Sequence, residues 1–568
     1  MEYYSTFCIK GREKSPYAFE QLVSYLKKTN DVDIVDFAGE GICCVSLEED
    51  TDTPKDSFKI KVDTDSIKIC SGSVSGFVYG VYSLLEMWGY RFFAPDCEKT
   101  PDKLIKLQPG EHIERPSFIA RELFWREAMD GSFAVKLKLN SARSSIEEKM
   151  GGKLMYYNFS HSFNDLVPVE RYFDEHPEYF SEIDGKRTKN KTQLCLTNPD
   201  VLQIVIDGVL KWKKENPDYK IFSVSMNDWY NNCTCENCHK IDSHEESGAG
   251  TVIHFVNKVA EEVEKTYPNI FIHTFAYLYC RKPPKYLKPR HNVIIRLCGI
   301  ENCFSHPIEE CGAHISAIDV QQGNAASFRG EKQDENLFLK DLKGWAKIAE
   351  NLFIWDYTTN YANYLQPFPN INVLQKNIKT YKQFNVKGVF AQGNFAFGHA
   401  SALAQLKIYI LAKLLWNADE NVETLIHEFC ESYYGKAGAT MEEYAKLFLD
   451  AGEHHAGIYD SPAAPYLSNE LLFKADELLK SAFRKETENP YLERLQREHL
   501  SIRYVLLARE NLSNPDREKR IDLFAQDARR LGISELFERK DFDSSIKFLK
   551  ETPLNSNRKG VLSISYPL

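Results

Sequence analysis

Strand-like and helix-like segments alternate through the middle of the chain, from about residue 116 to residue 394. Eight short apolar segments have the composition of buried strands: 119–125, 154–159, 193–197, 221–226, 271–277, 292–299, 352–356 and 388–392. Amphipathic segments with helical spacing separate them, among them 201–214, 252–266, 337–350 and 373–384. Alternating strands and helices form parallel sheets, and eight such units within about 280 residues suit a closed barrel. The alternation therefore predicts an α/β fold with a (β/α)8 TIM barrel over residues 116–399.

The segments on either side of this region have different patterns. Residues 1–115 combine an amphipathic helix at 18–28 with an alternating hairpin at 58–69, which indicates a small α/β domain. A second helix there is closed by Gly89 and followed by a strand that stops at Pro95. After residue 400 the pattern becomes helical, with predicted helices at 403–416, 422–434, 441–454, 470–484, 491–510 and 517–531. We therefore predict an all-helical domain over 400–568 that packs on the barrel.

Charge and composition exclude several classes of function. The formal net charge is −10, which argues against nucleic acid or an anionic membrane as the main partner. No apolar run approaches 18 residues, so no membrane span is expected. The first residues contain no basic stretch followed by an apolar segment, which predicts a cytoplasmic protein or a periplasmic or secreted one whose signal peptide is absent from this sequence. Most of the 14 cysteines lie in apolar runs, which favours a reducing compartment.

One cysteine-rich loop, Cys233-Thr-Cys235-Glu-Asn-Cys238, has the spacing of metal ligands. Thiolates at such spacing suit a structural zinc ion, with His239 or His244 as the fourth ligand. A disulfide between Cys235 and Cys238, or plain thiols, are the alternatives. No catalytic cofactor is expected, because the sequence has neither a glycine-rich phosphate loop nor a Gly-x-Ser-x-Gly motif.

Several motifs, in order along the chain, resemble those of a bacterial family known as domain of unknown function 4838. They are His176-Pro-Glu-Tyr-Phe-Ser181, Gln193-Leu-Cys-Leu-Thr-Asn-Pro199, Ser223-Val-Ser-Met-Asn-Asp228, the cysteine loop, Trp355-Asp-Tyr357, Gln366-Pro-Phe-Pro-Asn370 and Ala412-Lys-Leu-Leu-Trp-Asn417. The segment from Gly76 to Pro95 resembles the end of the small domain that precedes the barrel in family 67 α-glucuronidases and family 20 hexosaminidases. The resemblance implies a glycoside hydrolase.

Three carboxylates are candidates for catalysis, because glycoside hydrolysis needs an acid and a second carboxylate. Asp228 ends the fourth predicted strand, where the resembled families carry their acid, so we predict it to be the general acid. It follows Asn227, so the pair is Asn-Asp where those families have Asp-Glu. Asp356, at the end of the seventh strand, or Glu301, just past the sixth, is the predicted second carboxylate.

Other residues near strand ends are candidates for substrate binding. Arg126 suits a uronate carboxylate, with an ion pair to Glu127 as the alternative. The remaining candidates are Asn227, His161, Trp229, Tyr277, Trp355, Tyr357, Gln392 and Asn394.

The sequence thus predicts an exo-acting glycoside hydrolase whose substrate is an oligo- or polysaccharide containing uronic acid. Two alternatives remain open at this point. One is a non-catalytic carbohydrate-binding protein on a degenerate barrel, favoured by the Asn-Asp pair. The other is a structural role in polysaccharide processing, with the helical domain as a docking surface.

Overall fold

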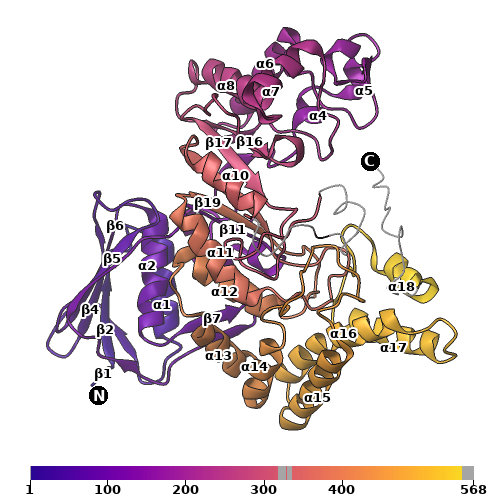
Figure 1. Ribbon diagram of the computed structural model, residues 1–568. Coiled ribbons are helices and arrows are strands. Elements are labelled where there is room, and N and C mark those ends of the chain that lie inside the picture. Colours follow the sequence, from indigo (N-terminus) through magenta and orange to yellow (C-terminus); the bar gives the residue numbers. More distant parts are fainter. Residues whose placement is uncertain (1, 317–327, 329–334, 399, 553–568) are drawn as a thin grey trace.

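The N-terminal part of the chain is a mixed sheet covered by two helices. The computed structural model describes residues 2–316, 328, 335–398 and 400–552. The sheet order is β10 (Gly110–Glu114), β5 (Phe58–Val62), β6 (Ser66–Ser71), β4 (Cys43–Glu49), β2 (Thr6–Lys10), β3 (Asp33–Val35). Helices α1 (Pro16–Leu26) and α2 (Val74–Met87) lie beside it (Figure 1). The close approach of α2 requires Gly80, because a Cβ there would lie 2.6 Å from Ile69 Cγ2.

The local predictions for this region are confirmed. β5 and β6 form the predicted antiparallel hairpin, with Val62 opposite Ile67. The predicted helix ends before Gly89, whose φ of +97° only glycine adopts without strain. β7 (Arg91–Ala94) follows at once.

The centre of the molecule is a curled sheet of parallel strands. Its order is β11 (Ala120–Phe124), β19 (Gly388–Gln392), β18 (Asn351–Tyr357), β17 (Val293–Cys298), β16 (Phe271–Ala276), β15 (Ile221–Ser223), β12 (Tyr156–Tyr157). The first and last predicted strands are neighbours, β11 beside β19, as barrel closure requires. Seven of the eight predicted strands are therefore present, and within the described residues β11 and β12 are not paired.

The third predicted strand, 193–197, is the exception. Leu194 forms a single bridge to Phe180, and β12 pairs directly with β15. The side chain of Gln193 explains the difference, since its amide donates to the carbonyls of Asn227 and Trp229 in the loop after β15. This segment is fixed by loop contacts rather than by a neighbouring strand, so among the described residues the curled parallel sheet has seven strands instead of the predicted eight.

The concave side of the curled sheet is filled by side chains. Arg296 on β17 forms a 3.0 Å ion pair with Glu122 on β11, and both side chains are buried. The guanidinium lies over the ring of Phe159, 4.4 Å from its centroid. Tyr156, Phe353 and Phe390 also pack in this interior cluster. The interior is therefore a packed core, and space for a ligand remains only toward the strand ends.

Helices cover the convex side and continue into the C-terminal part. Those between the strands are α6 (Pro199–Glu215), α8 (Ala249–Glu264), α10 (Leu337–Ala346) and α11 (Ile371–Gln383). Then follow α12 (Ala404–Trp416), α13 (Val422–Tyr433), α14 (Gly438–Lys446), α15 (Asn469–Lys485), α16 (Tyr491–Arg509), α17 (Arg517–Arg530) and α18 (Phe542–Glu551). Shorter elements are β1 (Tyr3–Tyr4), β8 (Cys97–Lys99), β9 (Leu104–Ile105), β13 (Glu182–Ile183), β14 (Lys186–Arg187), α3 (Gly131–Lys136), α4 (Phe163–Leu166), α5 (Val169–Tyr172) and α7 (Glu236–Glu245).

Helix α12 joins the N-terminal and central sheets. It packs beside β11 and β7, and Trp416 at its end stacks on Phe58 of the N-terminal sheet. Lys413 on α12 pairs with Glu86 on α2. Among the described residues, no helix combines the length and the apolar character needed to cross a bilayer.

Candidate functional site

A cavity of about 370 Å³ opens at the C-terminal ends of the central strands. Each of the seven strands supplies a lining residue at its end or in the loop that follows; these are Phe124, His161, Asp228, Tyr277, Cys298, Tyr357 and Gln392. Active sites of barrel enzymes occupy this position, because the loops after the strands converge there.

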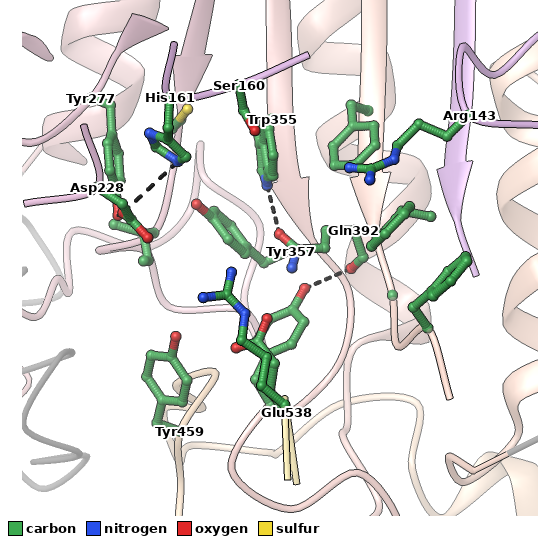
Figure 2. A pocket seen from close by; sticks show the side chains of 18 of the residues that line it. Arg143, Ser160, His161, Asp228, Tyr277, Trp355, Tyr357, Gln392, Tyr459 and Glu538 are labelled. Carbon is green, nitrogen blue, oxygen red and sulfur yellow. Dashed lines mark hydrogen bonds and ion pairs between the residues drawn. The ribbon is translucent and has the colours of Figure 1, made fainter. Parts of the chain in front are cut away.

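Asp228 presents a partly exposed carboxylate to the cavity (Figure 2). Its Oδ1 accepts a 3.3 Å hydrogen bond from Tyr277 and lies 4.0 Å from Nε2 of His161. Nδ1 of His161 lies 2.8 Å from the carbonyl of Met226, so Nδ1 carries a proton and donates it. The backbone of His161 has a φ of +55°, which is a strained value for histidine. The strained loop thus holds an imidazole beside the carboxylate.

The loop that carries Asp228 is fixed from behind by buried polar contacts. Asn227 is buried, and its Nδ2 donates to the carbonyl of Thr192. The indole Nε1 of Trp229 donates to the same carbonyl. Asn227 and Trp229 are not among the described residues that line the cavity. They position Asp228 rather than contact a ligand.

The opposite wall of the cavity comes from the C-terminal part of the chain. Glu535, Glu538 and Arg539 lie between α17 and α18, and Tyr459 lies between α14 and α15; all four line the cavity. The backbone N–H of Glu538 donates to the carbonyl of Tyr361 at 2.9 Å, which ties this segment to the loop after β18. Figure 2 shows Glu538 and Tyr459 apart from the group formed by Asp228, His161 and Tyr277.

The environment of Glu538 favours its protonated form. Burial raises the pKa of Glu538, and the negative charges of Asp228 and Glu535 raise it further, against the opposing charge of Arg539. Burial also raises the pKa of Glu535. Sequence reasoning missed these residues because they follow a helix rather than a strand, and no local pattern distinguishes them.

Aromatic rings and one amide form the floor of the cavity. Trp355 and Tyr357 line it, as predicted for aromatic platforms. Nε1 of Trp355 donates to Oε1 of Gln392 at 2.8 Å, and the carbonyl of Gln392 accepts from the hydroxyl of Tyr361 at 2.7 Å. The other aromatic lining residues are Phe124, Phe275, Tyr277, Tyr361, Tyr364, Phe390, Phe395 and Tyr459.

Asp356 lies on the other side of its strand. Successive side chains on a strand face opposite sides, so with Trp355 and Tyr357 toward the cavity, Asp356 faces the helices. Its carboxylate accepts from the N–H of Tyr357 at 2.8 Å and from the hydroxyl of Tyr381 on α11 at 3.2 Å. Burial raises the pKa of Asp356 to about 6. The structure thus separates Asp356 from Asp228.

Glu301 and Arg126 are also held away from the cavity. Glu301 pairs with Arg281, which pairs in turn with Asp341 at 2.7 Å. The guanidinium of Arg126 lies over Phe397, 4.0 Å from the ring centroid. Neither is among the described lining residues. The amide of Asn394 is similarly occupied, donating to the carbonyl of Ala400. The guanidinium groups that do line the cavity belong to Arg143 and Arg539.

The predicted cysteine loop is part of a four-cysteine group. Cys233, Cys235 and Cys238 lie with Cys195, and their Sγ atoms are all within 4.8 Å of one another. The fourth residue of the group is thus a cysteine, and neither His239 nor His244 belongs to it. All 14 cysteines of the sequence are free thiols in the structure.

A family model described as "Domain of unknown function (DUF4838)" matches residues 92–446. The chain belongs to this family. The match begins within β7 and ends with α14, so it includes every strand of the curled sheet. No curated protein matches the chain.

Solved structures show that this DUF4838 protein shares its fold with glycoside hydrolases. A family GH115 4-O-methyl-α-glucuronidase with specificity for decorated arabinogalactans matches with a TM-score of 0.57 at 11% identity, over 98% of this chain and 80% of that chain. A GH138 enzyme targeting pectin rhamnogalacturonan II matches with a TM-score of 0.50 at 10% identity, over 93% and 74%. A β-N-acetylhexosaminidase from Bacteroides fragilis matches with a TM-score of 0.41 at 12% identity, over 78% and 92%.

Proposed function

We propose that the protein is a glycoside hydrolase that removes a sugar residue from the end of a glycan, with Asp228 and Glu538 as its two carboxylates. The observation that carries the proposal is that these two side chains line one aromatic cavity at the strand ends. Glycoside hydrolysis generally uses two carboxyl groups that flank the scissile bond. Membership in a fold shared with glycoside hydrolases supports the reaction class but not the substrate.

The two carboxyl groups have different roles in this proposal. Glu538 acts as the general acid, because its raised pKa keeps a proton available for the departing glycosidic oxygen. Asp228 is the second carboxylate, which activates water or attacks the anomeric carbon. This assignment exchanges the role predicted for Asp228 from the sequence, since burial raises the pKa of Glu538 in the same cavity.

The size of the cavity supports action at a chain end. At about 370 Å³ it lies near the lower limit of the ~300–1,000 Å³ typical of ligand pockets. The aromatic floor suits the apolar face of a sugar ring. We assign a uronic acid as the substrate unit, because Arg143 and Arg539 line the cavity and a guanidinium binds a carboxylate through two parallel hydrogen bonds.

The fold itself fits a TIM barrel that is open at one seam. The strand order, the parallel register and the position of the cavity support a (β/α) barrel in which the loop segment 193–197 replaces the third strand. The sequence-based division into 1–115, 116–399 and 400–568 is retained with one qualification. Helix α12 packs against the central sheet and serves as the helix after the last strand.

A carbohydrate-binding protein without turnover is the second candidate. Asn227 favours it, because its buried amide donates to the backbone carbonyl of Thr192 in a neighbouring segment, where the resembled families have an acidic residue. This candidate predicts sugar affinity that persists without product release.

Sugar release from a panel of aryl glycosides and uronic-acid-containing glycans tests both candidates. We expect turnover by the wild type and loss of turnover in Asp228→Asn, with binding retained in the variant. Binding without release by the wild type would support the non-catalytic candidate. Turnover that survives Asp228→Asn would remove Asp228 from the reaction.

A further inference from the structure

A second metal-ligand group lies away from the cysteine loop, between the segment after β17 and the segment after α14. It consists of Cys303, His306, Cys311 and His455, whose ligand atoms all lie within 4.8 Å of one another. Cys303 and Cys311 are buried, and the two imidazoles are more exposed than the thiols. The first three residues are within nine positions of one another, but His455 is more than 140 residues away. The complete set exists only in the folded chain.

The distances in this group match four ligands around one point. Zinc bonds of about 2.3 Å to sulfur and about 2.0–2.1 Å to nitrogen place tetrahedral sulfur and nitrogen ligands about 3.6 Å apart. Sγ of Cys303 lies 3.2 Å from Nδ1 of His306 and 3.3 Å from Nδ1 of His455. Sγ of Cys311 lies 3.8 Å from Nδ1 of His455.

The tautomer of His306 is suited to metal binding. Its Nε2 lies 2.8 Å from the carbonyl of Gly452, which can only accept a hydrogen bond. Nε2 therefore carries a proton, and Nδ1 faces the sulfur of Cys303. Metal-bound histidines characteristically donate their other ring N–H to a carbonyl or carboxylate in this manner.

The four-cysteine group has the same geometry with sulfur ligands alone. Tetrahedral zinc places its sulfur ligands about 3.8 Å apart. Sγ of Cys195 lies 3.7 Å from Sγ of Cys235 and 3.9 Å from Sγ of Cys238. Disulfide sulfurs lie about 2.0 Å apart. The observed spacing is therefore that of sulfur ligands around one metal ion and not that of two bonded sulfurs.

Hydrogen-bond donors surround the sulfurs of this group. Cys235 is the N-cap of α7, and Cys238 lies in the first turn of that helix, where the helix dipole favours thiolates. The backbone N–H of Glu182 and Nη1 of Arg187 both approach Sγ of Cys233, at 3.4 and 3.5 Å. These contacts offset the negative charge that four thiolates bring to a zinc ion.

We propose that the protein binds two structural zinc ions, one at Cys303, His306, Cys311 and His455 and one at Cys195, Cys233, Cys235 and Cys238. Soft thiolates with imidazole in a tetrahedral arrangement select zinc among the common divalent metals. With four protein ligands each, both sites are closed to water and substrate, so the role is structural. The metal binding does not depend on the glycosidase proposal.

Each ion would brace a segment that reaches the cavity. The four-cysteine site begins five residues after Asp228 and joins its loop to Cys195, next to the segment that holds the loop through Gln193. The second site fixes the loop that carries Ile300 to the segment that carries Tyr459, and both residues line the cavity. The backbone bond from Phe304 N–H to the carbonyl of Ala456 joins the same two segments.

Metal analysis of the untagged full chain tests the proposal. The protein is purified under reducing conditions without chelators, and zinc, iron and copper are measured by plasma mass spectrometry. We expect two zinc ions per chain. X-ray absorption at the zinc edge of the wild type should give an average shell of three sulfurs and one nitrogen, the mean of the two ligand sets.

Variants assign the two ions to their sites. His455→Asn and Cys238→Ser should each retain one zinc ion, with average shells of four sulfurs in the first and two sulfurs plus two nitrogens in the second. Cys44→Ser removes a cysteine that belongs to neither group and should retain two ions. Folding of each variant is checked by circular dichroism.

Several results would overturn the proposal, and the wild type alone can give them. Fewer than two zinc ions after loading with stoichiometric zinc would contradict it, as would iron in place of zinc. A shell of nitrogen and oxygen ligands would indicate adventitious binding. A disulfide within either group, found by mass spectrometry of the unreduced protein, would replace zinc as the explanation of the clustered cysteines.

Discussion

The two walls of the cavity have different origins in the chain. One wall consists of residues at strand ends, such as Asp228, Tyr277 and Gln392. The other consists of Glu535, Glu538 and Arg539, which precede the last helix. The first wall follows from the architecture of a parallel sheet, since all strand ends meet at one edge. The second depends on where a distant segment packs. The proposed catalytic pair is divided between the two walls, so it comes together only after the whole chain has folded.

The largest expected difference in kcat is between an amide substitution inside the cavity and the same substitution outside it. Glu538→Gln should lower kcat by about 10²–10⁴-fold, because general acid catalysis contributes about that much. Asp356→Asn makes the same chemical change outside the cavity and should alter kcat by less than about threefold. Glycoside turnover under saturating substrate measures both. A larger loss of kcat in Asp356→Asn than in Glu538→Gln would instead assign the second carboxylate to Asp356.

The buried carboxylate of Asp356 should affect stability instead. Its pKa of about 6 in the folded protein exceeds the ordinary 3.8, so the folded state holds this proton more tightly than the unfolded state does. The free energy of unfolding therefore falls as pH rises from 3.8 through 6. A shift of two pKa units corresponds to about 3 kcal/mol. Asp356→Asn should be more stable than the wild type by up to about that amount at pH 8, and by little at pH 4.

Urea unfolding at the two pH values measures this difference. Asp207→Asn on α6 changes an exposed carboxylate and serves as the control. An equal stability change in Asp356→Asn at both pH values would indicate a packing effect rather than a titration.

The two arginines near the cavity provide the next contrast. Arg143 lines the cavity, whereas Arg126 lies over Phe397 outside it. Arg143→Gln should weaken binding of a uronic acid by about tenfold, since a charge-assisted hydrogen bond contributes about 1.5–3 kcal/mol. Arg126→Gln should change the affinity by less than about twofold. Calorimetric titration with an acidic sugar and its neutral counterpart measures both, and equal losses for the two sugars would exclude carboxylate recognition by Arg143.

The smallest expected effect concerns the pH profile. The negative charge of Glu535 helps to raise the pKa of Glu538. A general acid is lost as pH rises through its pKa, so Glu538 would set the alkaline limb of kcat/KM. Glu535→Gln should move that limb to lower pH by about half a unit, because one neighbouring charge is removed. Glu423→Gln on the exposed face of α13 should leave it in place. A shift to higher pH would contradict the assignment of Glu538.

The periodicity of apolar residues was sufficient to predict most helices and strands and part of the candidate site. The strand that ends at Tyr357 and the helix closed by Gly89 are set by local patterns of apolar residues and turn residues. The same patterns did not show that the segment 193–197 is held by the side chain of Gln193 instead of by backbone hydrogen bonds to a neighbouring strand. The patterns also placed Asp356 at the correct strand end. They did not show which face of the strand its side chain occupies, and in the structure it faces α11.

What the sequence determined by itself is the alternation that produces a parallel sheet, the position of Asp228 near a strand end and three of the four cysteines of one cluster. These depend on residues close together in the chain, and local propensity and spacing specify them. The tertiary structure alone decided the cavity wall that contains Glu538, the fourth cysteine of that cluster, Cys195, and the whole group of Cys303, His306, Cys311 and His455. Those arrangements join residues separated by 38 to more than 300 positions, and the packing of distant helices and loops brings them together.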